Sequence, residues 1–549
     1  MYAWLPNYPA GVPANINADA YPSVVAMLEE SFRKYGDRYA FACMGKRMTF
    51  KELDAASAQF GAYLHSRGLK PGDKIALMMP NLLQYPIAMF GALRAGLVVV
   101  NTNPLYTPRE MEHQFVDSEV QCIVIAENFA ANLQQIIDKT QIKTVILTSI
   151  GELLGVKGFF VNSVVRYVKR MVPAYQLPNT VTFSAAISGG KAFTLPVFAS
   201  KPSDTVFLQY TGGTTGIAKG AMLTNRNMVA NMLQMKAVIE PFLSSDTPAV
   251  ALSPLPMYHI FACTVNAFGL FALGHQSVLV TNARDLASVL KEFSQSEIAL
   301  ITGVNTLFNA LLNHKDFAKT DFSYLKIAVA GAMAVQKTVA ERWLAATKVR
   351  ITEGYGMTES APVISVNPLD GGRVGTIGLP VPSTEVRIAD ENDNALAQGE
   401  IGEIQVRGPQ VMLGYYKRPD ETEKTIRNGW LCTGDIGSMD ADGYFRIVDR
   451  LKDMILVSGF NVFPNEVEEI AVSHPKVLEA AAIGVPDANS SEAVKLFIVK
   501  KDASLTESEL KIFLREQLTG YKNPKTIVFR DELPKTNVGK ILRRALREE

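Results

Sequence analysis

A glycine- and threonine-rich stretch carries the clearest chemical signal in the chain. In VFLQYTGGTTGIAKGAMLTNRN (residues 206–227), five residues typical of a strand precede ten that are rich in Gly and Thr. Glycine lets the main chain approach an anion and adopt positive φ, so that backbone N–H groups and hydroxyls surround it. Lys219 would add a mobile positive charge for phosphate oxygens. The pattern predicts a phosphate-binding loop that is not of the Walker type, with a glycine-rich hairpin turn as the alternative.

Two polar residues in VRITEGYGMTES (349–360) could serve a metal ion beside a bound phosphate. Thr358 offers a hydroxyl and Glu359 a carboxylate. Magnesium on a nucleotide usually takes one or two protein oxygens together with phosphate oxygens and waters. The alternative is a pair of residues that caps the start of a helix.

A carboxylate and a lysine stand in two further predicted turns. Asp435 lies in Thr-Gly-Asp, a turn that could aim its carboxylate at vicinal hydroxyls such as those of a ribose. Lys540 lies in a Gly-Lys turn before the last helical run. The arginines of that run, Arg543, Arg544 and Arg547, are expected on a solvated helix.

Together these motifs resemble those of the acyl-adenylate-forming enzymes, the family of acyl-CoA synthetases, firefly luciferase and peptide-synthetase adenylation domains. TGGTTGIAKG is similar to the family's phosphate loop, and the motifs appear in family order over residues 20–549. The stretch from 428 to 466 (NGWLCTGDIGSMDADGYFRIVDRLKDMILVSGFNVFPNE) resembles the signature of bacterial-type long-chain fatty acid CoA ligases. The resemblance implies activation of a long-chain fatty acid by ATP to acyl-AMP. Thioester formation with coenzyme A would then give acyl-CoA, AMP and pyrophosphate.

The resemblance also implies a role for each residue that matches a family motif. The catalytic residues would be Lys540, Lys219 and Glu359, and the Mg²⁺ ligands Thr211 and Glu359. ATP would be bound by Thr211, Gly212, Gly213, Thr214, Thr215, Gly216, Lys219, Gly331, Ala332, Gly354, Tyr355, Gly356, Thr358, Asp435, Ile447, Arg450 and Lys452. The acyl pocket would include His259, Cys263 and Gly331. His259 on its own is more typical of a structural histidine.

Two departures from the family pattern and two other functions stay open. Cys432 stands where relatives often carry His, and Cys263 where some long-chain enzymes have a tryptophan gate to the acyl tunnel. An adenylate-forming ligase for another acid or acceptor, such as a fatty acyl-AMP ligase or a medium-chain or aryl-CoA ligase, is the first alternative. A non-enzymatic fatty-acid binding protein is the second, and the joint presence of Lys219, Glu359 and Lys540 argues against it.

Alternating helical and strand patterns predict an α/β fold with more than one domain. Apolar runs such as LVVVN, QCIVIA and KTVILT, each followed by a helical run, indicate a parallel sheet covered on both faces. We expect a large N-terminal domain of α/β sheets plus a β region over residues 1–449. A hinge at 450–453 and a small mobile α+β C-terminal domain at 454–549, which carries Lys540, would follow.

Composition limits the classes of partner and the compartment. The chain has 549 residues, and its 55 Lys and Arg nearly balance its 54 Asp and Glu, so nothing suggests a nucleic-acid binder. Four widely separated cysteines indicate a reducing compartment, and the N-terminus is unlike a signal peptide. Residues 247–283 lack charge but are interrupted by Pro, Gly and His, which favours a buried core over a membrane span. We expect a cytoplasmic enzyme, and a homodimer is an open option.

A basic segment could bring the protein to the inner face of the cytoplasmic membrane. No acidic residue lies between Glu152 and Asp204. One helical stripe is predicted to contain Val161, Val164, Val165, Val168, Met171 and Val172, with Arg166, Lys169 and Arg170 beside it. A basic amphipathic helix of this kind can lie in the interface of an anionic membrane, and a helix packed on its own protein is the alternative.

Overall fold

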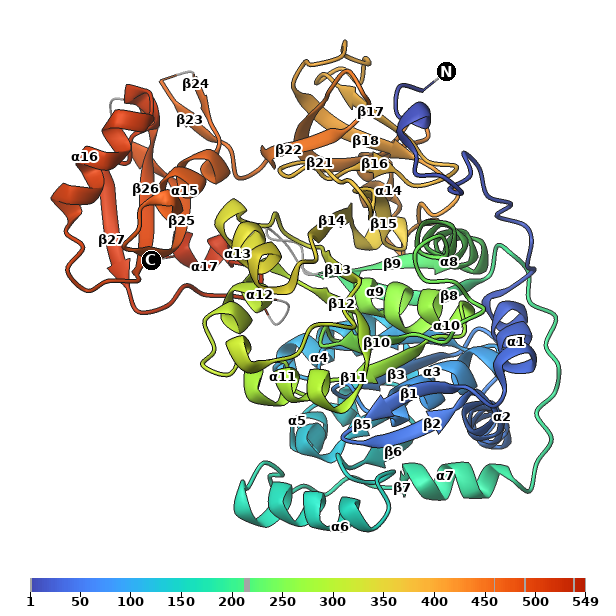
Figure 1. Cartoon of the computed structure of the whole chain (residues 1–549). Coiled ribbons are helices and arrows are strands. Elements are labelled where there is room, and N and C mark those ends of the chain that lie inside the picture. Colours follow the sequence, from blue (N-terminus) through green and yellow to red (C-terminus); the bar gives the residue numbers. More distant parts are fainter. Residues whose placement is uncertain (1, 212–217, 459, 488–489, 537–538, 549) are drawn as a thin grey trace.

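Two large, mostly parallel sheets form the N-terminal part of the molecule, as the α/β pattern predicts (Figure 1). The computed structural model describes residues 2–211, 218–458, 460–487, 490–536 and 539–548. From edge to edge, the nine-stranded sheet contains β16 (Leu379–Pro380), β15 (Val363–Val366), β14 (Ile351–Gly356), β13 (Ile327–Ala330), β12 (Ile298–Gly303), β10 (Val250–Ser253), β11 (Gln276–Leu279), β1 (Tyr39–Cys43) and β2 (Lys46–Thr49). The eight-stranded sheet contains β19 (Gly414–Tyr415), β9 (Lys219–Thr224), β8 (Thr205–Thr211), β4 (Val98–Asn101), β3 (Lys74–Met78), β5 (Val120–Ala126), β6 (Thr144–Thr148) and β7 (Thr180–Thr182).

Helices pack against these sheets, and several begin at caps that the sequence supplies. At the start of α2 and of α4, a threonine accepts from the N–H of a glutamate three residues on, and that glutamate bonds back. The helices are α1 (Val24–Tyr35), α2 (Phe50–Ser66), α3 (Gln84–Arg94), α4 (Pro108–Ser118), α5 (Ala130–Gln134), α6 (Val156–Ser163), α7 (Phe183–Gly190), α8 (Asn225–Ile239), α9 (Ile260–Ala262), α10 (Leu270–Ala272), α11 (Leu286–Gln295), α12 (Asn305–Leu312) and α13 (Lys337–Thr347).

The uncharged stretch 247–283 is core, as expected from its interruptions. It folds as β10, α9, a π-helix at Cys263–Gly269, α10 and β11, and the residues of these helices and of β11 are buried except the half-buried Phe261. Among the described residues, no helix combines the length and the apolar character needed to cross a bilayer.

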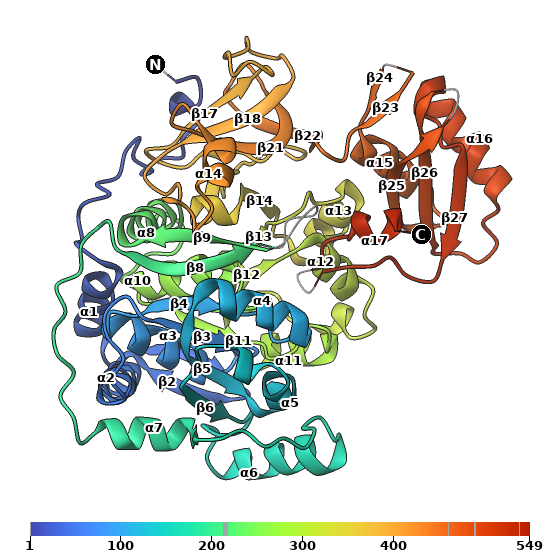
Figure 2. The same ribbon diagram turned by 180° about the vertical axis from the view of Figure 1, so that it is seen from behind.

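A third sheet and a fourth sheet complete the chain. The third contains β17 (Glu385–Ala389), β18 (Gly402–Arg407), β21 (Trp430–Met439), β20 (Ile426–Arg427) and β22 (Phe445–Arg450), with α14 (Pro419–Thr425) nearby. The fourth contains β24 (Phe460–Val462), β23 (Ile455–Val457), β26 (Ser491–Lys500), β25 (Val477–Asp487) and β27 (Thr526–Arg530), with α15 (Pro464–Ser473), α16 (Glu507–Gln517) and α17 (Arg543–Arg547). The chain therefore leaves one sheet at Arg450 and enters the next at Ile455. Figure 2 shows the fourth sheet and its helices as a separate small domain.

Candidate functional site

The predicted site residues lie where strands of the two large sheets end. Thr211 is the last residue of β8, Gly331 directly follows β13, and Gly356 is the last residue of β14. In α/β sheets, ligands bind beyond the carboxyl ends of the parallel strands. Strand β9 also contacts the short turn Thr358–Ser360, so the two sheets meet at this edge.

The phosphate-loop side of the site is an antiparallel hairpin. Strands β8 and β9 pair so that Thr211 stands opposite Lys219. The predicted phosphate-binding residues Gly212, Gly213, Thr214, Thr215 and Gly216 lie outside the described residues. Lys219 Nζ lies 2.6 Å from Glu421 Oε2 and 4.6 Å from the centre of the Tyr415 ring. The lysine is thus held at the base of the loop by a carboxylate and an aromatic face.

Glu359, the predicted metal ligand, is buried beside Tyr415. Glu359 is 6% exposed, and its Oε1 accepts a 2.6 Å hydrogen bond from the Tyr415 hydroxyl. Burial and the nearby Glu359 carboxylate raise the pKa of Tyr415 well above its usual value. The turn is capped by Ser360, whose Oγ accepts from the Met357 N–H, rather than by Thr358 or Glu359. The Glu359 carboxylate and the Thr211 hydroxyl, the two predicted ligands, are oxygen donors of the kind that Mg²⁺ prefers, so these residues fit this ion.

Tyr415 is the residue of this group that the sequence analysis missed. It follows Gly414 at the end of GPQVMLGYY, where β19 pairs with β9. Its hydroxyl contacts Glu359 and its ring contacts Lys219, so one side chain joins the predicted metal ligand to the predicted phosphate lysine. The only signal in the sequence was an aromatic residue after a glycine, which is too common to be specific.

Asp435 lies in a strand rather than in the predicted turn. It stands opposite Arg450 in the β21–β22 ladder, directly after Gly434, whose φ is +69°. Its carboxylate accepts from the Tyr355 hydroxyl at 2.6 Å and pairs with Arg450 Nε at 2.9 Å. Gly434 adopts the left-handed conformation that is typical of a turn, but pairing of β21 with β22 keeps the strand continuous. Residues from three separated motifs therefore meet at one buried carboxylate.

The remaining residues predicted to bind ATP are glycines and apolar residues, and several of them lie near Tyr355. Ile447 packs in the hydrophobic cluster that contains Tyr355, and Gly354 is paired with Val366. A Cβ on Gly356 would meet the Pro362 carbonyl at 2.0 Å, and one on Gly331 would meet the Phe261 ring at 2.9 Å. Packing alone thus explains Gly356 and Gly331, and the binding of ATP by Gly331 and Ala332 stays a prediction. Ala332 has a φ of +66°.

Lys540 reaches this site from the small domain. Its turn is closed by Thr536, whose N–H donates to the Lys540 carbonyl at 2.7 Å. Burial and the positive charge of Arg450 lower the pKa of Lys540 to about 8, although Asp435 acts in the opposite direction. Burial, together with the charge of Lys540, lowers the pKa of His259 to about 4. His259 is therefore neutral near pH 7, and its Nδ1 accepts from the Phe261 N–H at 3.4 Å.

The linker lysine Lys452 adds to this positive cluster. It lies between β22 and β23, where burial and the neighbouring Arg450 lower its pKa. Lys540, Arg450 and Lys452 thus gather positive charge around Asp435, an arrangement suited to a polyphosphate.

One residue predicted for the acyl pocket, Cys263, is packed in the core of the large domain. Cys263 is fully buried, with Sγ 3.7 Å from Met89 Sδ. A cavity of about 400 Å³ lies elsewhere, at the amino ends of strands β3, β4 and β8, and none of the predicted site residues lines it. Because ligands of such sheets bind at the carboxyl ends, we attach no catalytic role to that cavity. His259, Cys263 and Gly331 stay predictions for the acyl pocket.

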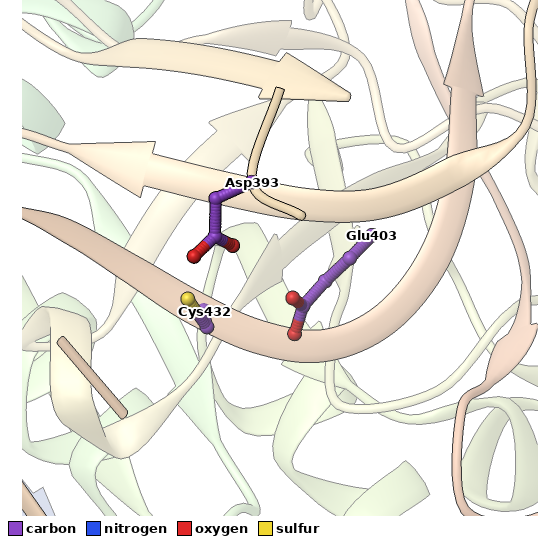
Figure 3. A group of neighbouring side chains, drawn as sticks. All are labelled: Asp393, Glu403 and Cys432. Atoms are coloured by element: carbon purple, nitrogen blue, oxygen red, sulfur yellow. The ribbon is translucent and has the colours of Figure 1, made fainter. Parts of the chain in front are cut away.

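Asp393, Glu403 and Cys432 form the group in Figure 3, where their oxygen and sulfur atoms point toward one another. Arg427 Nη2 lies 2.7 Å from Asp393 Oδ1 and 2.8 Å from Glu403 Oε2, so an arginine already occupies the space between the two carboxylates. Burial and the Glu403 charge raise the pKa of the Cys432 thiol to about 11, which disfavours the thiolate that a metal needs. Glu403 Oε1 also accepts from the Gly434 N–H at 2.9 Å, so the group supports the backbone next to Asp435.

Known proteins are similar to this chain over its whole length. The AMP-binding enzyme family matches residues 28–416, and the AMP-binding enzyme C-terminal domain matches residues 466–540. A "Long-chain-fatty-acid--CoA ligase" from Escherichia coli O157:H7 is 56% identical over 549 residues, which span all of this chain and 98% of that protein.

Solved structures agree with this relationship. An anthranilate CoA ligase in complex with anthranoyl-AMP superposes with a TM-score of 0.85 at 25% identity, over 97% of this chain and 98% of that one. ATP-bound MatB from Rhodopseudomonas palustris superposes with a TM-score of 0.80 at 27% identity, over 95% of this chain and 98% of that one. The chain belongs to the AMP-binding enzyme family.

Proposed function

We propose that this protein is a long-chain fatty acid–CoA ligase that forms acyl-AMP and then acyl-CoA. The observation that carries the proposal is the meeting of Lys540 from the small domain with the buried Asp435–Arg450 pair of the large one. The full-length similarity to long-chain-fatty-acid–CoA ligases supports the choice of acid and acceptor.

In the first step, a carboxylate oxygen of the fatty acid attacks the α-phosphorus of ATP, and pyrophosphate leaves. Charge then builds on the phosphate oxygens, so positioned cations lower the barrier. Lys540 would hold the carboxylate and the α-phosphate together, and Lys219 would exchange Glu421 for the departing pyrophosphate. Mg²⁺, held by Glu359 and Thr211, would neutralise phosphate charge when bound. Asp435 would hold the ribose hydroxyls, with Tyr355 and Arg450 fixing its carboxylate.

In the second step, the thiolate of coenzyme A attacks the acyl carbon, and AMP leaves with the carboxylate oxygen. The thiol needs the space beside the acyl carbon that Lys540 occupies. We propose that the small domain, 454–549, rotates about the linker 450–453 to clear this space. The change of sheet between Arg450 and Ile455 supports this position for the hinge.

The substrate class is tested by pyrophosphate release from ATP and Mg²⁺ with fatty acids from C6 to C18, each with and without CoA. We expect a burst of about one equivalent without CoA and steady turnover with it, greatest for the longer acids. Full turnover without CoA would point to another acceptor, and no response to any aliphatic acid would point to another acid.

Adenylation should fall at alkaline pH because Lys540 must be protonated. Its pKa in the free protein is about 8, so it is charged below this pH and neutral above it. Arg450, Lys452 and Arg543 lower this pKa and Asp435 raises it. We expect kcat/KM for pyrophosphate release, which reports the free enzyme, to decline above about pH 8. Lys540→Arg, which stays charged, should lose this alkaline limb; the same limb in both proteins would contradict the assignment.

We further propose that an apolar face on α6 and the residues after it docks on an anionic membrane. Its members are 42–82% exposed: Val156, Phe159, Phe160, Val164, Tyr167, Val168 and Met171. This face lies at the rim of the molecule far from the small domain (Figures 1 and 2). Lys169 and Arg170 flank it, and no acidic residue lies between Glu152 and Asp204. Exposed apolar residues on one helical face beside basic ones favour a lipid interface.

The predicted stripe was wrong in part. Val161, Val165 and Val172 are half-buried, and Arg166 pairs with the buried Glu127 at 2.8 Å. Arg166 is therefore a structural residue and should be left intact in a membrane test.

The membrane proposal predicts weaker sedimentation with phosphatidylglycerol-containing vesicles after Phe159, Phe160 and Tyr167 are changed to Ser. Because each aromatic side chain removes apolar area from water, we expect partitioning to fall by about tenfold or more. Lys169→Glu with Arg170→Glu should act similarly, and only at low salt. Ile512→Ser, at an equally exposed residue of the small domain, serves as control. If both variants sedimented as the wild type does, α6 would be an ordinary surface helix that does not bind the membrane.

A further inference from the structure

The C-terminal helix α17 is fixed by arginines that the sequence analysis expected in solvent. The side chain of Arg543 is 14% exposed and that of Arg547 is 32% exposed, whereas Arg544 is 58% exposed. The expectation was therefore wrong for Arg543 and right for Arg544, whereas Arg547 lies at the surface but is paired with Asp453. Arg544 pairs with Glu548 one turn further along the same helix.

Arg543 and Arg547 both bind Asp453, at the end of the linker between the domains. Arg547 Nη2 lies 2.8 Å from Asp453 Oδ1, and Arg543 Nη1 lies 3.4 Å from Asp453 Oδ2. The Asp453 side chain is 5% exposed. Burial alone would raise its pKa, but the two arginines outweigh burial and lower it. The carboxylate is thus ionised and held by two cations from one helix.

Arg543 ties the same helix to the body of the small domain. Its Nη2 contacts Glu468 Oε1 at 2.8 Å, and Glu468 also accepts from the Ala482 N–H at 2.7 Å. Leu546, between the two arginines, is buried against β25 and β26. Helix α17 is therefore joined both to the fourth sheet and to the linker.

Lys540 is joined to α17 through a short, hydrogen-bonded turn. It precedes Arg543 by three residues, and the Leu542 N–H donates to the Pro534 carbonyl at 2.8 Å. Figures 1 and 2 both show α17 beside α12 and α13, at the edge of the large domain that holds the site. A shift of α17 relative to Asp453 would displace Lys540 by a similar amount.

We propose that Arg543 and Arg547 are positioning residues for Lys540, which lock α17 to Asp453 so that the distal end of the linker and the lysine rotate as one body. The inference rests on the proposed function, since it concerns the lysine and the hinge of that reaction. Arg543 and Arg547 are therefore needed for acyl-AMP formation. Thioester formation, in which Lys540 has moved away, does not need them.

The test measures the two half-reactions separately in Arg547→Gln, Arg547→Lys and Arg544→Gln. We expect Arg547→Gln to slow acyl-AMP formation at least tenfold and to leave the attack of CoA on supplied acyl-AMP within twofold of wild type. Arg547→Lys, which keeps the charge, should recover most of the loss, and Arg544→Gln should match wild type in both steps. Arg547 is one-third exposed, so its replacement is expected to leave the domain folded.

A second variant separates positioning from folding. Asp453→Asn combined with Arg547→Gln should slow acyl-AMP formation by less than the product of the two single effects, because both changes break the same Arg547–Asp453 contact, although Asp453→Asn also weakens the contact with Arg543. Equal loss of both half-reactions, no loss in either, or additive effects would overturn the inference. A wild-type protein that makes no acyl-AMP would instead refute the proposed function.

Discussion

Replacing Lys540 by Ala should slow acyl-AMP formation by about 10²–10³-fold while the reaction of supplied acyl-AMP with CoA continues. Two unit charges about 4 Å apart attract by roughly 4 kcal/mol at an effective dielectric near 20. Removing one preorganised donor from a developing anion costs a comparable factor in other enzymes. In the proposed mechanism Lys540 leaves the site with the small domain before the second step, so the loss should be confined to the first step.

Single-turnover pyrophosphate release and single-turnover acyl-CoA formation measure the two steps for this variant. Lys511→Ala is the matched control, because Lys511 belongs to the same domain and forms an exposed i,i+4 pair with Glu507. If Lys540→Ala lost both steps equally, the lysine would not be specific to adenylation and the hinge assignment would be wrong.

Replacing Asp435 by Asn should impair both half-reactions, each by about 10²-fold in kcat/KM. Asp435 holds Tyr355 at 2.6 Å and Arg450 at 2.9 Å, and its side chain is 4% exposed. The amide keeps the shape but leaves the Arg450 charge without its partner, and hydrogen bonds to a charged group are worth about 1.5–3 kcal/mol. The AMP moiety is bound in both steps, so both should suffer.

Asp435→Asn should thus impair both half-reactions, whereas Lys540→Ala should impair only the first. Asp440→Asn is the control for Asp435→Asn, since Asp440 lies just beyond β21 and forms an exposed pair with Arg373 at 2.8 Å. The melting temperature of each variant shows whether folding is affected. A variant Asp435→Asn that lost only acyl-AMP formation would contradict a role in holding the nucleotide throughout.

The sequence predicted the elements well because their signals are local. Apolar runs gave the buried strands β4, β5 and β6. Thr211 and Lys219 face each other across β8 and β9, as a strand followed by a loop implies. The family match is confirmed over both domains.

What the sequence missed depends on contacts between distant residues. Arg543 looked solvated because its partners Asp453 and Glu468 lie 90 and 75 residues away. Tyr415 was missed because its role depends on the hydrogen bond that its hydroxyl donates to Glu359 across the two sheets. The apolar face of α6 was misplaced because the π-helix at Val164–Val168 shifts the helical phase, and periodicity does not say which side meets the core.

The central claim is that a fatty acid carboxylate attacks ATP at the α-phosphorus and that CoA then displaces AMP. The most direct test supplies palmitate labelled with ¹⁸O in both carboxylate positions, together with ATP, Mg²⁺ and CoA, and analyses the AMP by mass spectrometry. The account predicts one ¹⁸O in the AMP phosphate and one in the acyl-CoA carbonyl. AMP without label, with the second ¹⁸O in pyrophosphate or free phosphate instead, would contradict it.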